Sequence, residues 1–490
     1  MGSKLFSCLL IVVSTHLAHP ESVPPPSFQA VPVRMPNYPL KDKKIIYPDT
    51  LVNIARENIA NYASAKEIRD KIINKANYWL GFDHEALSGI ITSAEVLRAF
   101  DLSTSGCPVH GDTVFTVGGT YPWIVDPKKP LQVRCPVGRE VYPTNILTNC
   151  SHPDSSVKHE TDNLFVDDGW GWSSPAGEKY WFVAYANQWT WNKYIGPGLT
   201  SLAEAYLLTG NGQYAEKAAE MLYLIAKVYP SMDYENQSRY GWMMKQQNIR
   251  YPGKVLNRIW ETRFITGLAE AYDMIWDHID LSFSLQGKIG KSGEEIRSFI
   301  EANLLEDALE AIEQEKILGN FGMHQDALVT LHLARQYAGR DDAIEALINR
   351  HSSRFATSGL RYALYNQVKR DGIPYESPGY NTIWVSQLTR IADKLQKMAI
   401  DLFEEKKMKR LIDAPLEMVA IGKYTPDPGD GGSVRGGPVG RNSDIYQIVF
   451  NRYGDDKYLH WINQSAGKQF TSFSSLFREP LSNISPLPDN

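Results

Sequence analysis

The sequence predicts an all-α fold built from antiparallel helical hairpins. From about Asn53 to Phe100, and again from Tyr194 to Asp413, apolar residues recur at spacings of three and four, the period of a helix with one buried face. One helical string also recurs along the chain. No stretch alternates apolar and polar residues as a half-buried strand does, so no β domain is expected.

The recurring string marks a structural repeat. "GLTSLAEAYLLTG" places Tyr206, "FITGLAEAYDMI" places Tyr272 and "ALVTLHLARQYAG" places Tyr337, at spacings of 66 and 65 residues (272 − 206 and 337 − 272). A unit of this length holds two hairpins, or one with a long insert, and buries its apolar face only by stacking on its neighbours. The stack is an open solenoid or a closed ring. The alternative is that "LAEAY" is simply a good helix-forming string.

The N-terminus has the pattern of an export signal over residues 1–20. Lys4 precedes the apolar run "LFSCLLIVV", which is too short to span a bilayer, and cleavage is expected near Ala18. The proline-rich residues 21–52 predict an extended arm. No later run of about twenty apolar residues predicts a membrane anchor. The mature protein is therefore expected to be secreted or periplasmic.

The helical domain is expected over residues 53–446, with a long irregular insert near 103–180. This insert is rich in Gly, Pro, Asp and Trp. Long loops of that kind are usually functional or cover something. Residues 447–490 are expected to hold a C-terminal helix and tail.

Charge excludes one broad class of protein. The 490-residue chain has 43% hydrophobic and 22% charged residues and a net charge of −5, with a pI near 6.2. A dedicated nucleic-acid-binding protein normally carries a basic surplus. From Glu235 to Arg263, however, six Lys and Arg face two Glu, a local charge of +4. That segment suits a polyanion, although a solvated helix face is the alternative.

Two short stretches hold side chains that could do chemistry. "GNFGMHQDAL" places Asn320 and His324 on one face of a helix, and "DGIPYESPGY" fixes Tyr375, Glu376 and Tyr380 between prolines and glycines. Amide and imidazole donors can neutralise the carboxylate of a sugar acid, which makes its C5 proton removable. A tyrosine or histidine can take that proton, and a tyrosine can return one to the departing oxygen. The set predicts β-elimination, unless the Asn–His pair only serves the helix.

Several motifs follow one another between about Asn77 and Tyr446. In chain order they are "CPVHG", "RCPVGREVYPTN", "WNKYIGPGLTSLAEAYLLTG", "RIWETRFITGLAEAYDMI", "GNFGMHQDAL" and "YESPGY". In this order they resemble the heparinase II/III-like polysaccharide lyases. The resemblance implies an incomplete (α/α) toroid that cleaves a uronate-containing anionic polysaccharide, such as a glycosaminoglycan or alginate, and needs no cofactor. "YESPGY" resembles the family's E-x-S-P-x-Y element, whose last tyrosine is the catalytic acid/base, here Tyr380. The carboxylate-neutralising residue corresponds to Asn320, with His324 as the second match.

Substrate-binding side chains are expected among the local cations, the rigid segment and the tryptophans. Tryptophans can stack on sugar rings, but they are also common in cores. Glu376 is expected to orient its loop or a basic side chain. The candidates are Arg258, Arg263, Gln325, Tyr375, Glu376, Trp189 and Trp191.

The cysteines allow two interpretations. Cys107, His110 and Cys135 provide C-x2-H spacing and three soft ligands, one short of a closed zinc site, and Cys150 is a candidate fourth. A disulfide between Cys107 and Cys135 is the alternative. Each of these two cysteines opens a similar Cys-Pro turn, so they are expected to lie close together. Relatives often have a second C-x2-C where this chain has Gly138.

The chain departs from the resemblance in two further ways. Relatives usually continue into a β-sandwich domain that supplies another catalytic histidine, and residues 447–490 are too few to form one. Two explanations are open: a truncated gene product, in which residues 447–490 are the start of the missing β domain, or a split pair whose partner chain supplies it. In addition, Asn381 follows Tyr380 where relatives often have histidine.

Two other functions remain open from the sequence. An inverting glycoside hydrolase needs two carboxylic groups about 6.5–9.5 Å apart. Asp326, Asp371 and Glu376 are available for this, but no motif pairs them. A non-catalytic carbohydrate-binding toroid is the third possibility.

Overall fold

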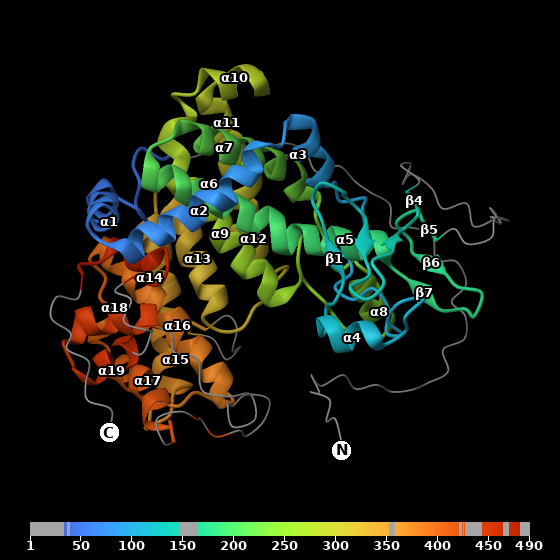
Figure 1. Cartoon of the computed structure of the whole chain (residues 1–490). Coiled ribbons are helices and arrows are strands. Elements are labelled where there is room, and N and C mark those ends of the chain that lie inside the picture. Colours follow the sequence, from blue (N-terminus) through green and yellow to red (C-terminus); the bar gives the residue numbers. More distant parts are fainter. Residues whose placement is uncertain are drawn as a thin grey trace.

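Helices make up most of the fold, and the strands are short (Figure 1). The computed structural model describes residues 34–36, 40–146, 165–351, 358–420, 424, 426, 443–463 and 470–480. Within these ranges every strand has two residues and lies between Ile124 and Tyr180. The prediction of an all-α fold is confirmed. Within these ranges, none of the helices combines the length and the apolar character that crossing a membrane requires.

The α-helices follow one another along the chain in this order: α1 (Asp49–Asn61), α2 (Ala63–Leu80), α3 (His84–Ile90), α4 (Thr113–Gly118), α5 (Phe182–Thr190), α6 (Gly196–Thr209), α7 (Gly212–Val228), α8 (Arg239–Gln246), α9 (Arg258–Ile279), α10 (Phe283–Ile289), α11 (Gly293–Ile300), α12 (Asp307–Glu313), α13 (Met323–Ala334), α14 (Arg340–Asn349), α15 (Leu360–Asn366), α16 (Pro378–Leu395), α17 (Lys406–Glu417), α18 (Ser443–Tyr453) and α19 (Lys457–Asn463). Short π or 3-10 segments are η1 (Trp191–Ile195), η2 (Tyr229–Ser231), η3 (Glu301–Glu306), η4 (Gln396–Met398), η5 (Leu402–Glu404) and η6 (Ser474–Phe477). The first helix begins four residues before the expected boundary at residue 53.

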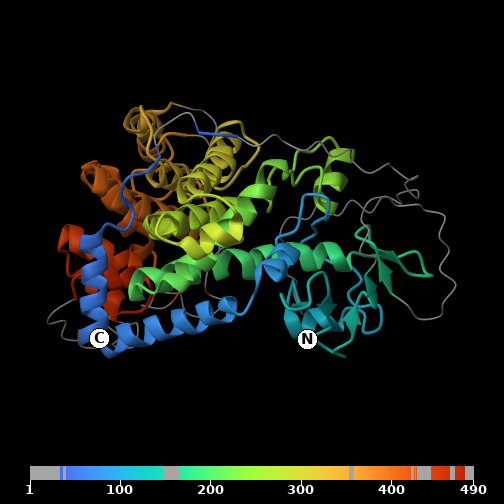
Figure 2. The same cartoon turned by 90° about the horizontal axis from the view of Figure 1, so that it is seen from above.

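Helices from successive parts of the chain form a row in which each contacts the next. The row runs α6, α9, α13, α16 and α18, and α2 packs on the far side of α6 (Figures 1 and 2). The helices between them return along a second layer: α7 packs on α6 and α9, α14 on α13, and α17 on α16. Each hairpin therefore contributes one helix to the inner row and one to the outer layer.

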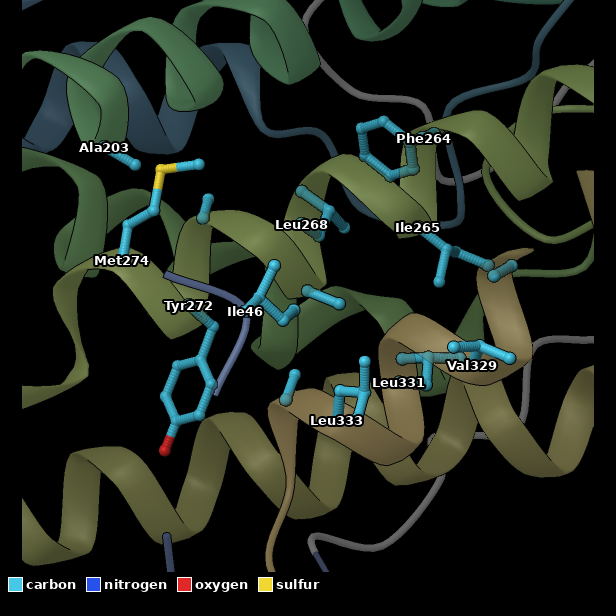
Figure 3. Packing of buried hydrophobic residues seen from close by; sticks show 14 of the residues in the cluster. Ile46, Ala203, Phe264, Ile265, Leu268, Tyr272, Met274, Val329, Leu331 and Leu333 are labelled. Carbon is cyan, nitrogen blue, oxygen red and sulfur yellow. The ribbon is translucent and has the colours of Figure 1, made fainter. Parts of the chain in front are cut away.

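The recurring "LAEAY" string explains the closest part of this row. Its alanines Ala203 and Ala205 on α6, and Ala269 and Ala271 on α9, are all buried. Small side chains let two helices approach closely, and larger apolar residues fill the space around them, as Figure 3 shows for Leu268. The third string, "ALVTLHLARQYAG", does not repeat this arrangement. Its helix, α13, ends at Ala334, so Tyr337 lies beyond the helix.

One buried lysine ties three helices of the row together. Lys394 of α16 lies 2.8 Å from Glu270 of α9 and 2.8 Å from Asp326 of α13, and it donates to Thr330 at 2.8 Å. Burial alone would lower the pKa of Lys394. The charges of Asp326 and Glu270 outweigh burial and raise that pKa above its ordinary value. The ion pairs of Lys394 thus help to fix the relative position of α9, α13 and α16.

The described part of the arm lies against α9. Asp273 of α9 is fully buried and binds the ammonium of Lys41. Its carboxylate also accepts backbone N–H groups of Ile45, Ile46 and Tyr47, each at 3.0 Å. Figure 3 shows the segment of Ile46 beside α9. Four donors satisfy one buried carboxylate, so the arm is part of the folded core.

Residues from the two ends of the chain meet. Asn58 of α1 donates to the carbonyls of Leu476 and Arg478, both at 2.8 Å. The ring of Tyr47 packs on Phe473 and Phe477. Part of the segment expected to be a tail is therefore packed. The export signal, Cys8, Cys150 and most of the glycine-rich stretch 424–443 lie outside the described residues.

The irregular insert forms a small core of its own beside α5 and α8 (Figure 1). Its strands are β1 (Ile124–Val125), β2 (Val133–Arg134), β3 (Val141–Tyr142), β4 (Asn145–Ile146), β5 (Val166–Asp167), β6 (Trp172–Ser173) and β7 (Lys179–Tyr180). β1, β2 and β3 form an antiparallel sheet, β4 and β5 pair in parallel, and β6 and β7 pair antiparallel. Tyr194 of η1 donates to the carbonyl of Val125 at 2.7 Å, which joins the insert to the helical row.

Candidate functional site

The loop before α13 lies between the second turn of α9 and the second and third turns of α16. A Cβ on Gly319 would lie only 2.9 Å from Cγ2 of Thr262, and one on Gly322 only 2.7 Å from Cβ of Gln387. The ring of Phe321 packs on Trp384 with centroids 4.2 Å apart. The N-terminal end of α13 therefore lies beside the first half of α9 and of α16. Helix N-termini carry partial positive charge and favour anions.

Asn320 sits in the middle of this loop and is partly exposed. Its carbonyl accepts the backbone N–H of His324 at 3.3 Å. The His324 side chain is 1% exposed, and its Nε2 lies 3.3 Å from the carbonyl oxygen of Ile317. Of the two residues predicted to neutralise a carboxylate, Asn320 is at the surface, whereas His324 holds the loop that presents it.

Tyr380 is the third residue of α16 and is partly exposed. Positions 380, 384 and 387 fall on one stripe of an α-helix. Since Trp384 and Gln387 contact the loop before α13, Tyr380 lies on the same stripe, one turn nearer the N-terminal end. The structure thus places Asn320 and Tyr380 at the same end of adjacent helices. Pro378 at the first position favours the helix start.

The segment before α16 is closely held. Gly372 has φ +89°, and a Cβ there would lie 2.1 Å from the carbonyl oxygen of Arg410, so glycine is required. Asp371 accepts the backbone N–H of Ile373 at 3.0 Å. The exposed ring of Tyr375 lies under Lys369, whose Nζ is 5.0 Å from its centroid. Glu376 is partly buried in this segment.

Aromatic side chains from distant parts of the sequence gather beside the start of α9. Their ring centroids are separated by 4.2 Å between Phe100 and Tyr240, and by up to 6.5 Å between Phe100 and Tyr251. Most of these rings are partly exposed. We call this group the aromatic cluster: Phe100, Tyr121, Trp189, Tyr240, Tyr251 and Trp260. Sequence reasoning found only Trp189, which at 5% exposure is the most buried ring of the group.

Arg258 opens α9 in an unusual backbone conformation. Its φ is +42°, and its N–H donates to the carbonyl of Pro252 at 3.1 Å. The exposed guanidinium carbon lies 5.0 Å from the centroid of Tyr251, and Asn257 donates to the Tyr251 hydroxyl at 2.8 Å. A positive φ is costly for a bulky side chain and often marks a functional position.

The other cations of the +4 segment are mostly engaged. Arg239 pairs with Asp101 at 3.2 Å, and buried Lys254 pairs with Asp307. Lys245 donates to Asn236 and Arg250 to the carbonyl of Glu315. Arg258 and Arg263 are exposed, and the described residues provide neither with a carboxylate within 4.0 Å. Both arginines therefore add positive charge near the loop before α13.

Two predicted substrate-binding residues are corrected. Trp191 is fully buried and donates to Thr92 Oγ1 at 3.1 Å, so it belongs to the core. Gln325 is 1% exposed; it donates to the carbonyl of Ser358 at 3.0 Å and accepts the N–H of Gly322 at 2.7 Å. Neither side chain offers a surface to a sugar.

Two of the three carboxylates considered for a hydrolase have partners. Asp326 is 5% exposed and paired with Lys394, and exposed Asp371 accepts the N–H of Ile373. Glu376, the third, is partly buried in the segment before α16.

Cys107, His110 and Cys135 lie together in the insert. One ligand atom from each lies within 4.8 Å of the others, and both cysteines are free thiols. The prediction that Cys107 and Cys135 are close is confirmed. The cluster belongs to the small core and not to the end of the helical row.

The likeness of this chain to known proteins is structural and distant. No family model matches the sequence, and no curated protein matches it. Among solved structures, an alginate lyase from Bacteroides ovatus is similar over 89% of this chain and 98% of that chain, with 13% sequence identity and a TM-score of 0.47. At this identity the likeness concerns the course of the chain, so function must be argued from the side chains.

Proposed function

We propose that the protein is a heparinase II/III-like polysaccharide lyase that cleaves a uronate-containing anionic polysaccharide by β-elimination. The observation that supports this proposal is the contact between Phe321, which follows Asn320, and Trp384, which lies one helical turn after Tyr380. Arg258 and Arg263 of α9 lie on the neighbouring helix of the row.

The substrate carboxylate is held by donors and partial positive charge. The Asn320 amide donates to a carboxylate oxygen, and the helix N-termini around it favour the negative charge. Arg258 and Arg263 attract the polyanion over a longer range. Partly exposed rings of the aromatic cluster, such as Trp260, offer faces on which neutral parts of the sugars pack.

Neutralising the carboxylate makes the adjacent C5 proton acidic enough to remove. Tyr380 takes that proton as a phenolate, the C–H electron pair forms the C4–C5 double bond, and the bond from C4 to the bridging oxygen breaks. The Tyr380 proton then passes to the departing oxygen. A free tyrosine has a pKa near 10. Its place in the first turn of α16 favours the anion, because the helix dipole stabilises negative charge there.

His324 and the loop segment "DGIPYESPGY" act as positioning elements. The Nε2 contact of His324 to Ile317 fixes the turn that carries Asn320. Gly372, packed against Arg410, fixes the approach to α16. Both reduce the motion of the two reacting groups relative to each other, which is where an enzyme gains from proximity.

The test is a product assay with purified full-length protein on alginate, hyaluronan, heparan sulfate and a neutral glucan. A lyase leaves an unsaturated sugar that absorbs in the ultraviolet, and Tyr380→Phe should lower its formation by at least a hundredfold. Tyr365→Phe, which alters an exposed tyrosine bonded to Glu405, is the matched control. New reducing ends without ultraviolet absorbance would show a hydrolase instead. Binding of the acidic polymers without any product would show a non-catalytic protein.

Export is a separate part of the proposal and rests on the pattern of residues 1–20. Sequencing the N-terminus of protein recovered from the medium or periplasm tests it. An intact Met1 on the recovered protein would contradict cleavage near Ala18.

A further inference from the structure

Two Cys-Pro turns face each other in the insert, and we propose that they bind a structural zinc ion through Cys107, His110, Cys135 and Glu140. Three of these residues form a group of metal-ligand side chains. We infer that Glu140 is the fourth ligand from the geometry of the turn that begins at Cys135. The site is independent of the proposed lyase chemistry.

Both turns are closed by backbone hydrogen bonds at their cysteines. Cys107 and Gly111 exchange N–H···O bonds of 2.9 and 2.8 Å. Cys135 donates its N–H to Glu140 at 2.8 Å and accepts that of Arg139 at 3.1 Å. Each turn begins Cys-Pro-Val, so each presents its sulfur from the same kind of bend.

The turns differ three residues after the cysteine. The first has His110 there, and the second has Gly138. A Cβ on Gly138 would lie 2.2 Å from Glu140 Oε1 and 2.2 Å from His110 Cε1. The missing side chain therefore leaves the space into which the Glu140 carboxylate turns. The second turn supplies its ligand from two residues further along the chain.

The three distances from His110 Nδ1 match those expected in a tetrahedral zinc site, and the ligand atoms of Cys107, His110 and Cys135 lie within 4.8 Å of one another. His110 Nδ1 lies 3.6 Å from Cys107 Sγ, 3.6 Å from Cys135 Sγ and 3.6 Å from Glu140 Oε2. With zinc bonds of about 2.3 Å to sulfur and about 2.0–2.1 Å to nitrogen and oxygen, neighbouring ligand atoms are separated by roughly 3.3–3.8 Å. The Glu140 Oε2 atom is buried and has no hydrogen-bond donor among the residues that the structure describes. An ion between these four atoms would give that oxygen a partner.

The ligand types select the metal. Two thiolates and an imidazole are too soft for calcium or magnesium, and four protein ligands close the site, as in structural zinc centres. A structural ion is useful here because the strands of the insert have only two residues each. The ion would join the turn at Cys107 to the β2–β3 hairpin at Cys135 and Glu140. The same insert carries Tyr121, which packs in the aromatic cluster against Trp189 and Trp260.

The experiment uses purified full-length protein prepared under reducing conditions and dialysed against zinc-free buffer. Elemental analysis should find about one zinc per chain, and cobalt in its place should give the intense near-ultraviolet thiolate bands and visible bands of a tetrahedral centre. Cys107→Ser and Cys135→Ser should lose both signals. An intact mass lower by two hydrogens, with no metal, would show a disulfide and overturn the proposal.

Two further variants test the fourth ligand. Glu140→Gln should weaken zinc binding at least tenfold in competition with a chelator and shift the cobalt bands. Glu178→Gln, which changes another carboxylate of the insert, bonded to Ser105 and Tyr180, should match the parent. Cys150→Ser is expected to bind as the parent does. If Cys150→Ser releases the metal while Glu140→Gln retains it, Glu140 is not the ligand.

Discussion

Phe321 packs against Trp384 with their ring centroids 4.2 Å apart, and this contact joins the loop before α13 to the first turns of α16. Asn320 precedes one ring in sequence, and Tyr380 lies one helical turn before the other. Since both rings are buried, the relative height of the two polar side chains is set by core packing. The chemistry we propose depends on that alignment.

A negative charge at position 320 should harm activity more than loss of the amide. Asn320→Ala removes a donor to the substrate carboxylate and should lower kcat/KM by about a hundredfold. Asn320→Asp keeps the size but repels the carboxylate, so the loss should be larger. Initial rates on the best substrate measure both. Asn366→Asp, on the exposed side of α15, is the control; equal rates for Asn320→Asp and the parent would remove Asn320 from the mechanism.

Replacing Arg258 by glycine should weaken substrate binding without lowering the stability of the fold. Glycine accepts φ +42° freely, so Arg258→Gly should keep or raise the Tm, because roughly 1–3 kcal/mol of strain is released. The same change removes a cation beside Tyr251 and should raise KM several-fold, with a weaker dependence of KM on salt. Thermal melts and KM at two ionic strengths test this. A KM equal to that of the parent at both salt concentrations would exclude Arg258 from the binding surface.

Removing the Lys394 ammonium should destabilise the helical row. Lys394→Met leaves the buried Asp326 carboxylate without its partner, which should lower the free energy of unfolding by about 3–5 kcal/mol. The double variant Lys394→Met with Asp326→Leu should recover much of the loss, because the more buried of the two carboxylates is then removed and Glu270, whose side chain is 23% exposed, stays partly hydrated. Denaturant unfolding measures the series, with exposed Lys406→Met as the control, expected within about 0.5 kcal/mol of the parent. A double variant no more stable than Lys394→Met would argue against this account.

Glu261 should make the fold less stable as pH rises. Burial raises the pKa of the Glu261 carboxyl to about 7, although the N–H of Leu256 and the hydroxyl of Tyr229 partly oppose this. An unfolded glutamate has a pKa of about 4.3. Between those two values the folded state binds a proton that the unfolded state does not, so the free energy of unfolding decreases as pH increases. Above pH 7 the effect of this group levels off.

Replacing Glu261 by glutamine removes that titration. The Tm of Glu261→Gln should therefore fall less than that of the parent between pH 5 and pH 7, whereas exposed Glu294→Gln should follow the parent. Melts at half-unit pH steps measure the slopes. Identical slopes for the parent and Glu261→Gln would show that the carboxyl titrates normally in the fold.

The helical architecture was predictable because apolar spacing is a local property. The "LAEAY" string also located equivalent positions on α6 and α9, since close helix packing requires small residues there. It failed at Tyr337, because α13 ends at Ala334 and the same letters fall beyond the helix. The residue at which a helix ends depends on the tertiary fold as well as on the local sequence pattern.

The site was only partly predictable, because its parts are far apart in sequence. Trp189 and Trp191 are two residues apart and look alike in the sequence, yet one joins the aromatic cluster and the other is core. Phe100, Tyr240 and Trp260 meet only once the insert packs on α9. The position of Glu140 beside His110 likewise depends on the space that Gly138 leaves, which no spacing rule describes.

The carboxylate of Asp273 has a consequence for the order of assembly. Its partner Lys41 lies 232 residues earlier in the chain, so the arm leaves the ribosome long before α9 exists. Until the helix is made, residues 41–47 have nothing to bind, and afterwards they cover a charge that would otherwise be buried alone. Residues 41–47 are therefore made early and find their place late.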